Sequence, residues 1–503
     1  MKKDSKKNYI IADYGASNGR VYIGTYYGNK FEIQTLHRFE NSQVLLNGSY
    51  FWDILKLFSE LKKGISIAFS KYDNIRSVAV DTWGLDFGFI DKSGKLISNP
   101  LTYRDHDKSR RPVENLLKTI TPEEFYEFTG YFATPVAPAF YLEKLVSEKS
   151  YELENTYKFL PLSDLFNYFM TGNFAIEYSM ACGTLLVNCH TKTWEDKIIK
   201  NSGFSKSILP DIIDPGVKIG NISSEICNEI GIKTFPVAVA VGHDSASAIA
   251  GIPAISSGPK DTSPVFLSTG TWLVLGVETD GPIINFDALR HMFTNEGGVL
   301  RKNFFARNLT GFWIIQQCVD RWLRTGGNRI SWREIDDSYQ RVQPFLSLIN
   351  TEDTVFTQNH EDMPEVIRNY CCQNTIHVPQ SIGEISRCIY ESLVMAVRHY
   401  YELLVKYYGM KINKLNLIGG GVNNRLFCQW LANALKIEIS AGPLEASSVG
   451  NLLMQLMADG EINNIREARQ LSFNSCKLTT YEPSDCDLWE NKYKEYVSFF
   501  NFD

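Results

Sequence analysis

One aspartate, Asp244, stands where a protein chain could present a general base. It lies in Gly242-His243-Asp244-Ser245, directly before an Ala/Ser-rich stretch, 246–252, that predicts a helix. A carboxylate at the mouth of a cleft could accept the proton of a hydroxyl while a phosphoryl group moves to the hydroxyl oxygen. The alternative is that Asp244 is only the N-cap of this helix, and spacing alone favours the cap.

A second group of residues suited to chemistry forms a turn near the N-terminus. The strand-like run 9–13 ends in Asp13, and Gly15 and Gly19 then permit a tight turn whose backbone N–H groups could converge on phosphate oxygens. Asp13 could hold a hydrated Mg²⁺. Further hydrogen-bond donors in the turn are Ser17, Asn18 and Arg20. The competing interpretation is an ordinary turn flanked by polar residues.

Two more turns could complete a nucleotide site. Ser268-Thr269-Gly270-Thr271 lies between apolar strands and could offer backbone donors to the other side of a triphosphate. Gly419-Gly420-Gly421 follows a predicted strand and would let adenine and ribose approach the main chain closely. Similar strings occur in surface hairpins and flexible turns, so neither is specific by itself.

The segment Asp81-Thr82-Trp83-Gly84-Leu85-Asp86-Phe87 has the composition of a sugar site. Carboxylates accept hydrogen bonds from hydroxyls, and aromatic faces cover the C–H surface of a sugar. Two acids, an aromatic wall and a glycine that permits close approach all occur within seven residues. A buried tryptophan with two capping acids is the structural alternative.

The elements that must hold these turns predict a mixed α/β protein with two related halves. A hairpin over 9–13 and 21–26 is echoed about half a chain later by 265–268 and 272–277. The other predicted elements are a strand over 31–39, a helix over 52–69, a buried strand over 77–80, a helix over 382–408 that stops at Gly409, a strand over 415–418, a helix over 425–435 and a strand over 437–440. The last three make a βαβ unit whose glycine-rich loop lies at a strand's carboxyl end, where open α/β sheets bind ligands.

Bulk composition agrees with two domains and excludes several classes of protein. A chain of 503 residues is too long for one core, and the polar stretch 256–264 suits a connection between domains. Apolar residues make up 44% and charged residues 21%, with a net charge of −6 and no concentrated basic patch, which argues against nucleic acid as a partner. No signal-peptide core, run of eighteen apolar residues or paired-cysteine metal spacing occurs, so we expect a cytosolic protein without a membrane partner.

No P-loop and no dinucleotide fingerprint is present, so a nucleotide site must be built from other turns. Taken together and in order, the segments resemble those of the FGGY carbohydrate kinases over about residues 9–457. The strings that carry the resemblance are Asp13-x-Gly15-Ala16-Ser17-x-Gly19-Arg20, His37-Arg38-Phe39, Trp52-Asp53, Asp81-Thr82-Trp83-Gly84-x-Asp86-Phe87, Tyr103-Arg104-Asp105, His243-Asp244-x-Ala246-Ser247-Ala248, Ser268-Thr269-Gly270-Thr271-Trp272, Asn295-Glu296-Gly297-Gly298, Gly419-Gly420-Gly421 and Ala441-Gly442-Pro443-x-Glu445-Ala446-Ser447.

The resemblance implies a two-domain actin/hexokinase-like (ribonuclease H-like) ATPase fold with an interdomain cleft. We expect an N-terminal domain over 1–250 with the sugar site and the first phosphate hairpin. A C-terminal domain over 265–503 would carry the second phosphate turn and the adenosine site, and its tail could pack back on the first domain.

The resemblance also implies roles for individual residues, and it favours Asp244 as the proton acceptor over the cap. Asp13 would lie near Mg²⁺, through water. The expected ATP contacts are Ala16, Ser17, Asn18, Gly19, Arg20, Thr271, Gln316 and Gly420. The expected sugar contacts are Gly84, His243, Ser245 and Asn308. The composition of the segment 81–87, in which Gly84 lies, adds Asp81 and Trp83.

The expected reaction moves a phosphoryl group from MgATP to the 1-hydroxyl of a 6-deoxy-ketohexose, with L-rhamnulose as the first choice. The Asp-Thr-Trp-Gly and Ala-Gly-Pro strings favour that sugar over glycerol or xylulose. Tyr14, Asn18 and Ser245 depart from the family pattern, which leaves L-fuculose or another ketose or pentulose as an alternative. A non-catalytic sugar or nucleotide sensor is a third possibility. The oligomeric state, monomer or homodimer, stays open.

Overall fold

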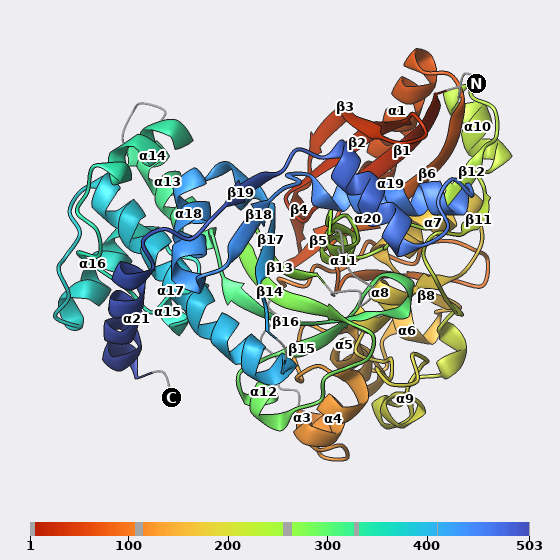
Figure 1. Ribbon diagram of the computed structural model, residues 1–503. Coiled ribbons are helices and arrows are strands. Elements are labelled where there is room, and N and C mark those ends of the chain that lie inside the picture. The colour runs from red at the N-terminus through yellow and green to blue at the C-terminus, as the bar shows by residue number, and fades with distance from the viewer. Residues whose placement is uncertain (1–5, 106–113, 255–263, 326–330, 410, 502–503) are drawn as a thin grey trace. The chain divides into compact units, whose positions relative to one another are not determined.

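The computed structural model describes residues 6–105, 114–254, 264–325, 331–409 and 411–501 (Figure 1). The chain divides into two compact units, and both are discontinuous in sequence. The first comprises Met1–Ser263, Glu278–Phe305 and Glu445–Cys476, and the second comprises Pro264–Val277, Ala306–Leu444 and Lys477–Asp503. The connection expected over 256–264 lies, apart from Pro264, outside the described residues. The predicted domain limits remain predictions.

The first unit is built on a six-stranded mixed sheet in the order β11-β12-β6-β1-β2-β3. Its strands are β1 (Lys7–Tyr14), β2 (Asn18–Tyr26), β3 (Phe31–Glu40), β6 (Ile75–Thr82), β11 (Lys218–Asn221) and β12 (Pro236–Ala238). β1 and β2 form the predicted antiparallel hairpin, and β6 runs parallel to β1 on its other side. The predicted hairpin and the two following strands are therefore confirmed.

The remaining elements of the first unit surround this sheet and extend it. Its helices are α1 (Ile54–Lys71), α3 (Glu114–Leu117), α4 (Pro122–Thr129), α5 (Pro138–Ser147), α6 (Tyr151–Glu154), α7 (Leu162–Thr171), α8 (Tyr178–Gly183), α9 (Asp196–Ser202), α10 (Ser224–Ile230), α11 (Asp244–Ala250), α12 (Phe286–Arg290), α19 (Ala446–Ala458) and α20 (Ile465–Ser475). Short strands are β4 (Gln43–Leu46), β5 (Ser49–Trp52), β7 (Phe87–Ile90), β8 (Lys158–Pro161), β9 (Ile176–Glu177), β10 (Ile212–Ile213) and β15 (Thr294–Gly297). The helix predicted over 52–69 begins two residues later, because Asp53 caps it and Trp52 ends β5.

Alternate side chains of β1 and β6 face opposite sides of the sheet, as the two-residue period of a strand requires. Ile10 and Val80 point into the apolar core that α1 and α7 cover. Asp13 and Asp81 point to the other side, where both carboxylates accept hydrogen bonds from α19. The same strands thus supply a core on one face and two acids on the other.

Helices α11 and α19 pack on each other with almost no space between their backbones. A Cβ on Gly251 or Gly450 would collide with main-chain atoms of the opposite helix. The Ser247 hydroxyl donates to the Ser447 carbonyl at 2.9 Å, which ties the two helices together near their N-termini. Glycine and serine here bring the N-termini of α11 and α19 to the edge of the sheet where β1 and β6 end.

The second unit holds six strands of a mixed seven-stranded sheet, in the order β16-β14-β13-β17-β18-β19, and β15 of the first unit stands before β16 in that order. Its strands are β13 (Val265–Thr269), β14 (Trp272–Thr279), β16 (Asn303–Thr310), β17 (Lys414–Gly419), β18 (Glu438–Ala441) and β19 (Thr479–Tyr481), of which β14 ends and β16 begins in the first unit. Its helices are α13 (Trp313–Thr325), α14 (Trp332–Gln340), α15 (Thr354–Thr357), α16 (Met363–Gln373), α17 (Ile382–Tyr408), α18 (Arg425–Leu435) and α21 (Cys486–Phe500).

The second unit confirms the predicted hairpin, long helix and βαβ segment. β13 and β14 pair antiparallel, and β17 lies parallel to both β13 and β18. α17 ends at Gly409, whose left-handed φ of 73° closes the helix as predicted. Within the described part of the chain, no helix is long and apolar enough to span a bilayer.

Candidate active site

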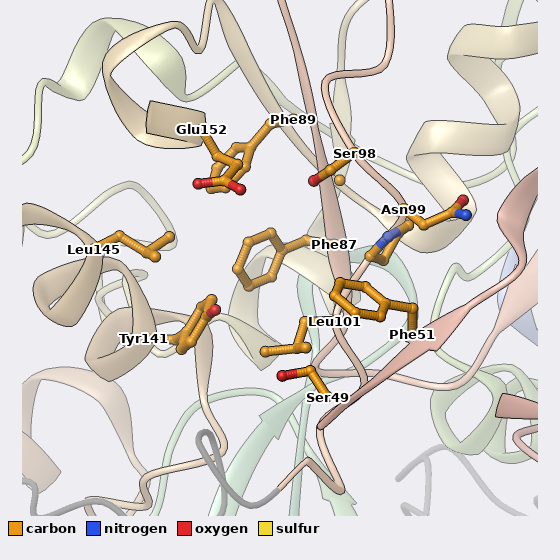
Figure 2. Close-up of a pocket in the computed structure, with 12 residues that line it drawn as sticks. Ser49, Phe51, Phe87, Phe89, Ser98, Asn99, Leu101, Tyr141, Leu145 and Glu152 are labelled. Atoms are coloured by element: carbon orange, nitrogen blue, oxygen red, sulfur yellow. The ribbon is translucent and has the colours of Figure 1, made fainter. Parts of the chain in front are cut away.

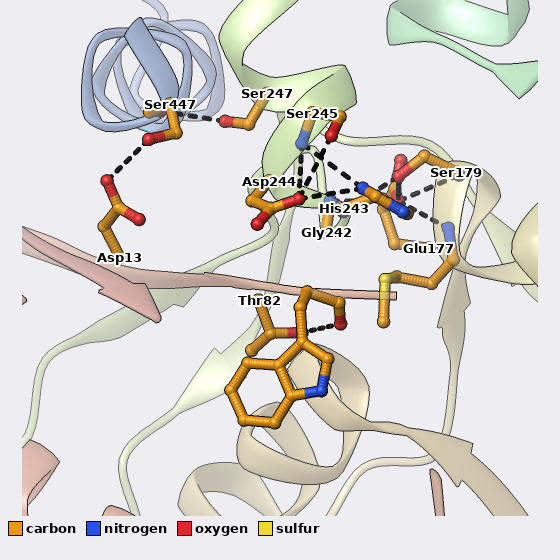
Figure 3. A network of polar contacts seen from close by, with 12 residues as sticks. Asp13, Thr82, Glu177, Ser179, Gly242, His243, Asp244, Ser245, Ser247 and Ser447 are labelled. Atoms are coloured by element: carbon orange, nitrogen blue, oxygen red, sulfur yellow. Dashed lines mark hydrogen bonds and ion pairs between the residues drawn. The ribbon is translucent and has the colours of Figure 1, made fainter. Parts of the chain in front are cut away.

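Asp244 is the first residue of α11 and not its cap. The cap is His243, whose Nδ1 accepts from the Ser245 N–H at 3.2 Å. The same N–H donates to Asp244 Oδ1 at 2.6 Å, and Oδ1 also lies 3.1 Å from His243 Nδ1 (Figure 3). The Asp244 side chain is 32% exposed, and no described residue donates a hydrogen bond to Oδ2. The interpretation of Asp244 as the helix cap is therefore wrong, because the cap is the residue before it. Oδ2 of Asp244 could accept a hydrogen bond from an incoming hydroxyl.

His243 is held between the end of β6 and Gly84. The Thr82 N–H donates to the Gly242 carbonyl at 2.8 Å, which fixes the chain before the histidine. A Cβ on Gly84 would lie 2.5 Å from His243 Nε2, so only glycine leaves room for the ring. Burial lowers the pKa of His243, but its hydrogen bond with Asp244 and the charges of Asp244 and Glu296 raise that pKa by more. The raised pKa of His243 therefore reflects the carboxylates around its ring.

Two further carboxylates lie at the ends of β1 and β6. Asp13 Oδ2 accepts from the hydroxyls of Ser447 and Ser448, each at 2.6 Å. Asp81 is fully buried, with Oδ2 accepting from Asn451 Nδ2 at 2.6 Å. Burial raises the pKa of both carboxyls, and the charge of Asp13 raises that of Asp81 further. A sugar hydroxyl could reach Asp81 only if the surrounding packing changed.

The other predicted sugar contacts differ in accessibility. Trp83 is 4% exposed, and its Nε1 donates to Asp86 Oδ2 at 2.8 Å. Asp86 also accepts from Trp52 Nε1 at 2.6 Å, and the two indole rings lie 4.5 Å apart between centroids. The two indoles and Asp86 thus form one hydrogen-bonded, packed cluster. Asn308 belongs to the second unit, where it is exposed on β16.

The first phosphate turn joins β1 to β2 with its polar groups exposed. The Gly15 N–H donates to the Asn18 carbonyl at 2.9 Å, and the side chains of Ser17 and Asn18 are open to solvent. Arg20 Nη1 lies 2.5 Å from Glu445 Oε2, directly before α19. The predicted ATP contacts in this turn and the strand after it are Ala16, Ser17, Asn18, Gly19 and Arg20. The turn can present donors to an anion, and Arg20 already has a carboxylate partner.

The second unit brings its three predicted ATP contacts together around one strand end. Thr271 Oγ1 lies 3.4 Å from Gln316 Oε1 on α13. The Gly421 N–H donates to Thr269 Oγ1 at 2.8 Å, which fixes the glycine-rich loop beside the turn that holds Thr271. Gly420 in that loop is exposed. Hydroxyl, amide and open main chain thus lie side by side at the carboxyl ends of β13 and β17.

Several residues of this site were not assigned from the sequence. Glu177 and Ser179, at the start of α8, bond to the backbone just before Asp244. Glu296 on β15 is half-buried, and its charge raises the pKa of His243. Glu296 lies within a string that carried the family resemblance, which was an available signal. The sequence around Glu177 indicates at most a helix cap.

A separate pocket of about 180 Å³ lies in the first unit, on the side of β7 (Figure 2). Aromatic rings dominate its wall, with Glu152 and Asn99 among the polar groups. The aromatic residues are Phe51, Phe87, Phe89 and Tyr141. None of the predicted site residues is among the described residues that line it. The pocket therefore does not belong to the group around Asp244.

The fold and this arrangement define a class of protein. Each unit carries an antiparallel hairpin with a small, glycine-containing turn, and the first adds an aspartate beside a histidine at a helix start. A phosphotransferase needs backbone donors that bind phosphate oxygens, which glycine-containing turns can offer. It also needs a carboxylate that can take the proton of a hydroxyl. The molecule is a two-domain kinase of the actin-like ATPase fold.

Comparison with known proteins identifies the family. Residues 8–251 match the N-terminal domain, and residues 265–458 the C-terminal domain, of the FGGY family of carbohydrate kinases. The chain belongs to this family. It is a phosphotransferase that acts on a sugar hydroxyl and uses ATP.

Individual relatives cover nearly the whole chain. A rhamnulokinase from Bacteroides thetaiotaomicron is 35% identical over 488 residues, which is 97% of this chain and 98% of the relative. A rhamnulokinase from Halalkalibacterium halodurans is 32% identical, covering 95% of this chain and 99% of its own. Among solved structures, a xylulose kinase from Lactobacillus acidophilus has a TM-score of 0.79 at 17% identity, with 98% of each chain covered. A glycerol kinase from Plasmodium falciparum with ADP has a TM-score of 0.74 at 16% identity, covering 98% and 97%. The structural likenesses concern the fold.

Proposed function

We propose that this kinase converts L-rhamnulose and ATP to L-rhamnulose 1-phosphate and ADP, with Asp244 as the base. The observation that carries the role of Asp244 is its geometry: Oδ1 is occupied by the Ser245 N–H and His243, while Oδ2 faces no described donor. The choice of sugar rests on relatives at 32–35% identity over nearly their full length, all named rhamnulokinase.

The proposed chemistry is an in-line transfer. The 1-hydroxyl gives its proton to Asp244 as its oxygen attacks the γ-phosphorus, and the bond from that phosphorus to the β,γ-bridging oxygen breaks to release ADP. Backbone donors at the two phosphate turns would bind the triphosphate, together with the proposed contacts of Thr271, Gln316 and Gly420. Gly84, His243, Ser245 and Asn308 would bind the sugar.

Asp13 fits the role of a magnesium site that works through water. Mg²⁺ usually keeps several waters and binds one or two carboxylates plus substrate phosphates, so a single aspartate suffices. Ser447 and Ser448 fix one oxygen of Asp13, which orients the carboxylate at the strand end. The ion, when bound with ATP, would neutralise the charge on the phosphate oxygens. We propose a cytosolic location, which the ten free cysteines support.

The test is ADP release over a panel of L-rhamnulose, L-fuculose, D-xylulose, L-ribulose and glycerol, with Asp244→Asn alongside. We expect the highest kcat/KM for L-rhamnulose and a loss of about 10²–10⁴-fold in kcat for Asp244→Asn. Asp196 is the matched control, because it is also the first residue of a helix in the first unit. Asp196→Asn should keep normal turnover.

Each contrary result removes a different part of the proposal. A preference for L-fuculose or a pentulose would keep the mechanism and change the sugar. Failure of every polyol and ketose to stimulate ADP release would leave a sensor as the better interpretation. Normal turnover by Asp244→Asn would remove the base assignment.

A further inference from the structure

The backbone that leads into Asp244 is bonded to a carboxylate that the sequence did not single out. The Gly242 N–H donates to Glu177 Oε2 at 3.0 Å. The His243 N–H donates to Ser179 Oγ at 3.1 Å, and that hydroxyl in turn donates to Glu177 Oε2 (Figure 3). The two residues before the base are therefore both anchored, directly or through one hydroxyl, to Glu177.

Glu177 is itself held in one place. Its side chain is fully buried and caps α8, with Oε2 accepting from the N–H groups of Ser179 at 2.9 Å and Met180 at 3.3 Å. A Cβ on Gly242 would lie 3.1 Å from Oε2 and 2.6 Å from Ser163 Oγ, so glycine is needed for the main chain to reach the carboxylate. The anchor is therefore the N-cap of α8, and the first N–H groups of that helix hold its carboxylate.

Burial and hydrogen bonds act in opposite directions on the pKa of Glu177. Burial raises this pKa, and the four donors to Oε2, from Ser179, Met180 and Gly242, oppose the rise because they favour the ionised form. Burial, together with the charge of Glu177, raises the pKa of the neighbouring buried Asp164 well above its usual range. The negative charge of Glu177 also contributes to the raised pKa of His243.

We propose that Glu177 is a positioning residue for phosphoryl transfer: its buried carboxylate orients the Gly242-His243 backbone and thereby aims the carboxylate of Asp244. This inference rests on the proposed function of Asp244. The Thr82 N–H already holds the Gly242 carbonyl from the side of β6. Glu177 supplies the opposite restraint, so the peptide before the base is fixed from both sides.

The decisive variant is Glu177→Gln, which keeps the size of the side chain and removes its charge. A displacement of about 1 Å at a reacting group can cost about 10²-fold in rate. We therefore expect kcat with L-rhamnulose to fall about 10–100-fold, with the KM for ATP within about twofold of the wild type. Glu195→Gln is the matched control, because Glu195 also caps a helix of the first unit, α9, through its side chain. It should leave kcat unchanged.

Two measurements separate positioning from general stability. Amide exchange of the peptide over 238–248 should accelerate in Glu177→Gln at a temperature where the variant is folded, and stay unchanged in Glu195→Gln. The imidazole of His243, assigned by comparison with His243→Gln, should titrate at a lower pH in Glu177→Gln. A loss of global stability would accelerate exchange throughout the first unit, whereas loss of the anchor accelerates it over 238–248 alone and also shifts the His243 titration.

A folded Glu177→Gln with wild-type kcat, wild-type exchange over 238–248 and an unshifted His243 titration overturns the inference. If this variant does not fold, Ser179→Ala decides, because it removes only the hydroxyl between His243 and Glu177. A fall of about threefold or more in kcat at constant KM for ATP supports the anchor, and an unchanged kcat rejects it. Absence of ketose turnover in the wild type would overturn the proposed function alone, because exchange and titration are measured without substrate.

Discussion

Replacing Gly84 by alanine adds a single methyl group against the ring of His243. That Cβ would lie 2.5 Å from Nε2 and 2.7 Å from Cδ2, whereas ordinary contacts begin near 3.4 Å. The backbone of Gly84 lies outside the left-handed region, so alanine adds no backbone strain and the effect comes from the contact alone. The ring must therefore move by roughly 1 Å, and Asp244 with it, since Asp244 Oδ1 lies 3.1 Å from the ring nitrogen Nδ1.

A movement of this size predicts a loss of about 10²-fold in kcat/KM for the sugar, equivalent to about 2.7 kcal/mol of transition-state stabilisation. The assay is initial-rate ADP release at varied L-rhamnulose and saturating ATP, with the affinity for ATP measured separately and expected to stay the same. Gly183→Ala is the control, because a Cβ there meets nothing within 4 Å. A kcat/KM for Gly84→Ala within twofold of the wild type would refute the contact between Gly84 and His243 as a determinant of activity.

Three further outcomes follow from the charged groups of the first unit. Burial and the charge of Asp13 hold the pKa of Asp81 well above its unfolded value, so folding takes up a proton and stability falls as pH rises from about 4 towards the folded pKa. Thermal melts should therefore show Asp81→Asn gaining stability over the wild type between pH 5 and 8. Parallel curves of melting temperature against pH would contradict this. Ser447→Ala removes a hydrogen bond that lowers the pKa of Asp13, so that pKa should rise. The acidic limb of the plot of kcat/KM against pH should then move to higher pH, and an unmoved limb would be the contrary result. Glu445→Gln releases Arg20 from its carboxylate, so the KM for ATP should fall by about twofold or more at low salt, and an unchanged or higher KM would count against Arg20 as a phosphate contact.

Local sequence patterns determined much of the architecture, because hairpins and long helices depend on residues close together in the chain. Alternating apolar residues and glycines predicted β1 and β2, and the apolar spacing before Gly409 predicted α17 to its last residue. The predicted helix over 52–69 was displaced by two residues, because the cap at Asp53 outweighed the apolar period that began at Trp52. Cap chemistry acts over one turn, and periodicity alone places helix ends poorly.

The ordered strings also indicated the class of protein, and the family comparison confirmed it. They could not decide what each acid does. Asp13, Asp81 and Asp244 each lie at the start or end of a regular element, and a carboxylate in that position can be a cap, a buried partner or a base.

Only the tertiary structure separated these acids, because their roles depend on segments far away in sequence. Asp81 is enclosed by a helix that begins 365 residues later, as its bond to Asn451 in α19, Ala446–Ala458, shows. Asp244 is not the cap, because His243 occupies that position. Glu177 became visible only once α8 was placed against Gly242, 65 residues further along the chain. Sequence therefore determined which chemical groups the protein possesses, whereas long-range packing decided which carboxylates are buried and which of their oxygens are held by donors.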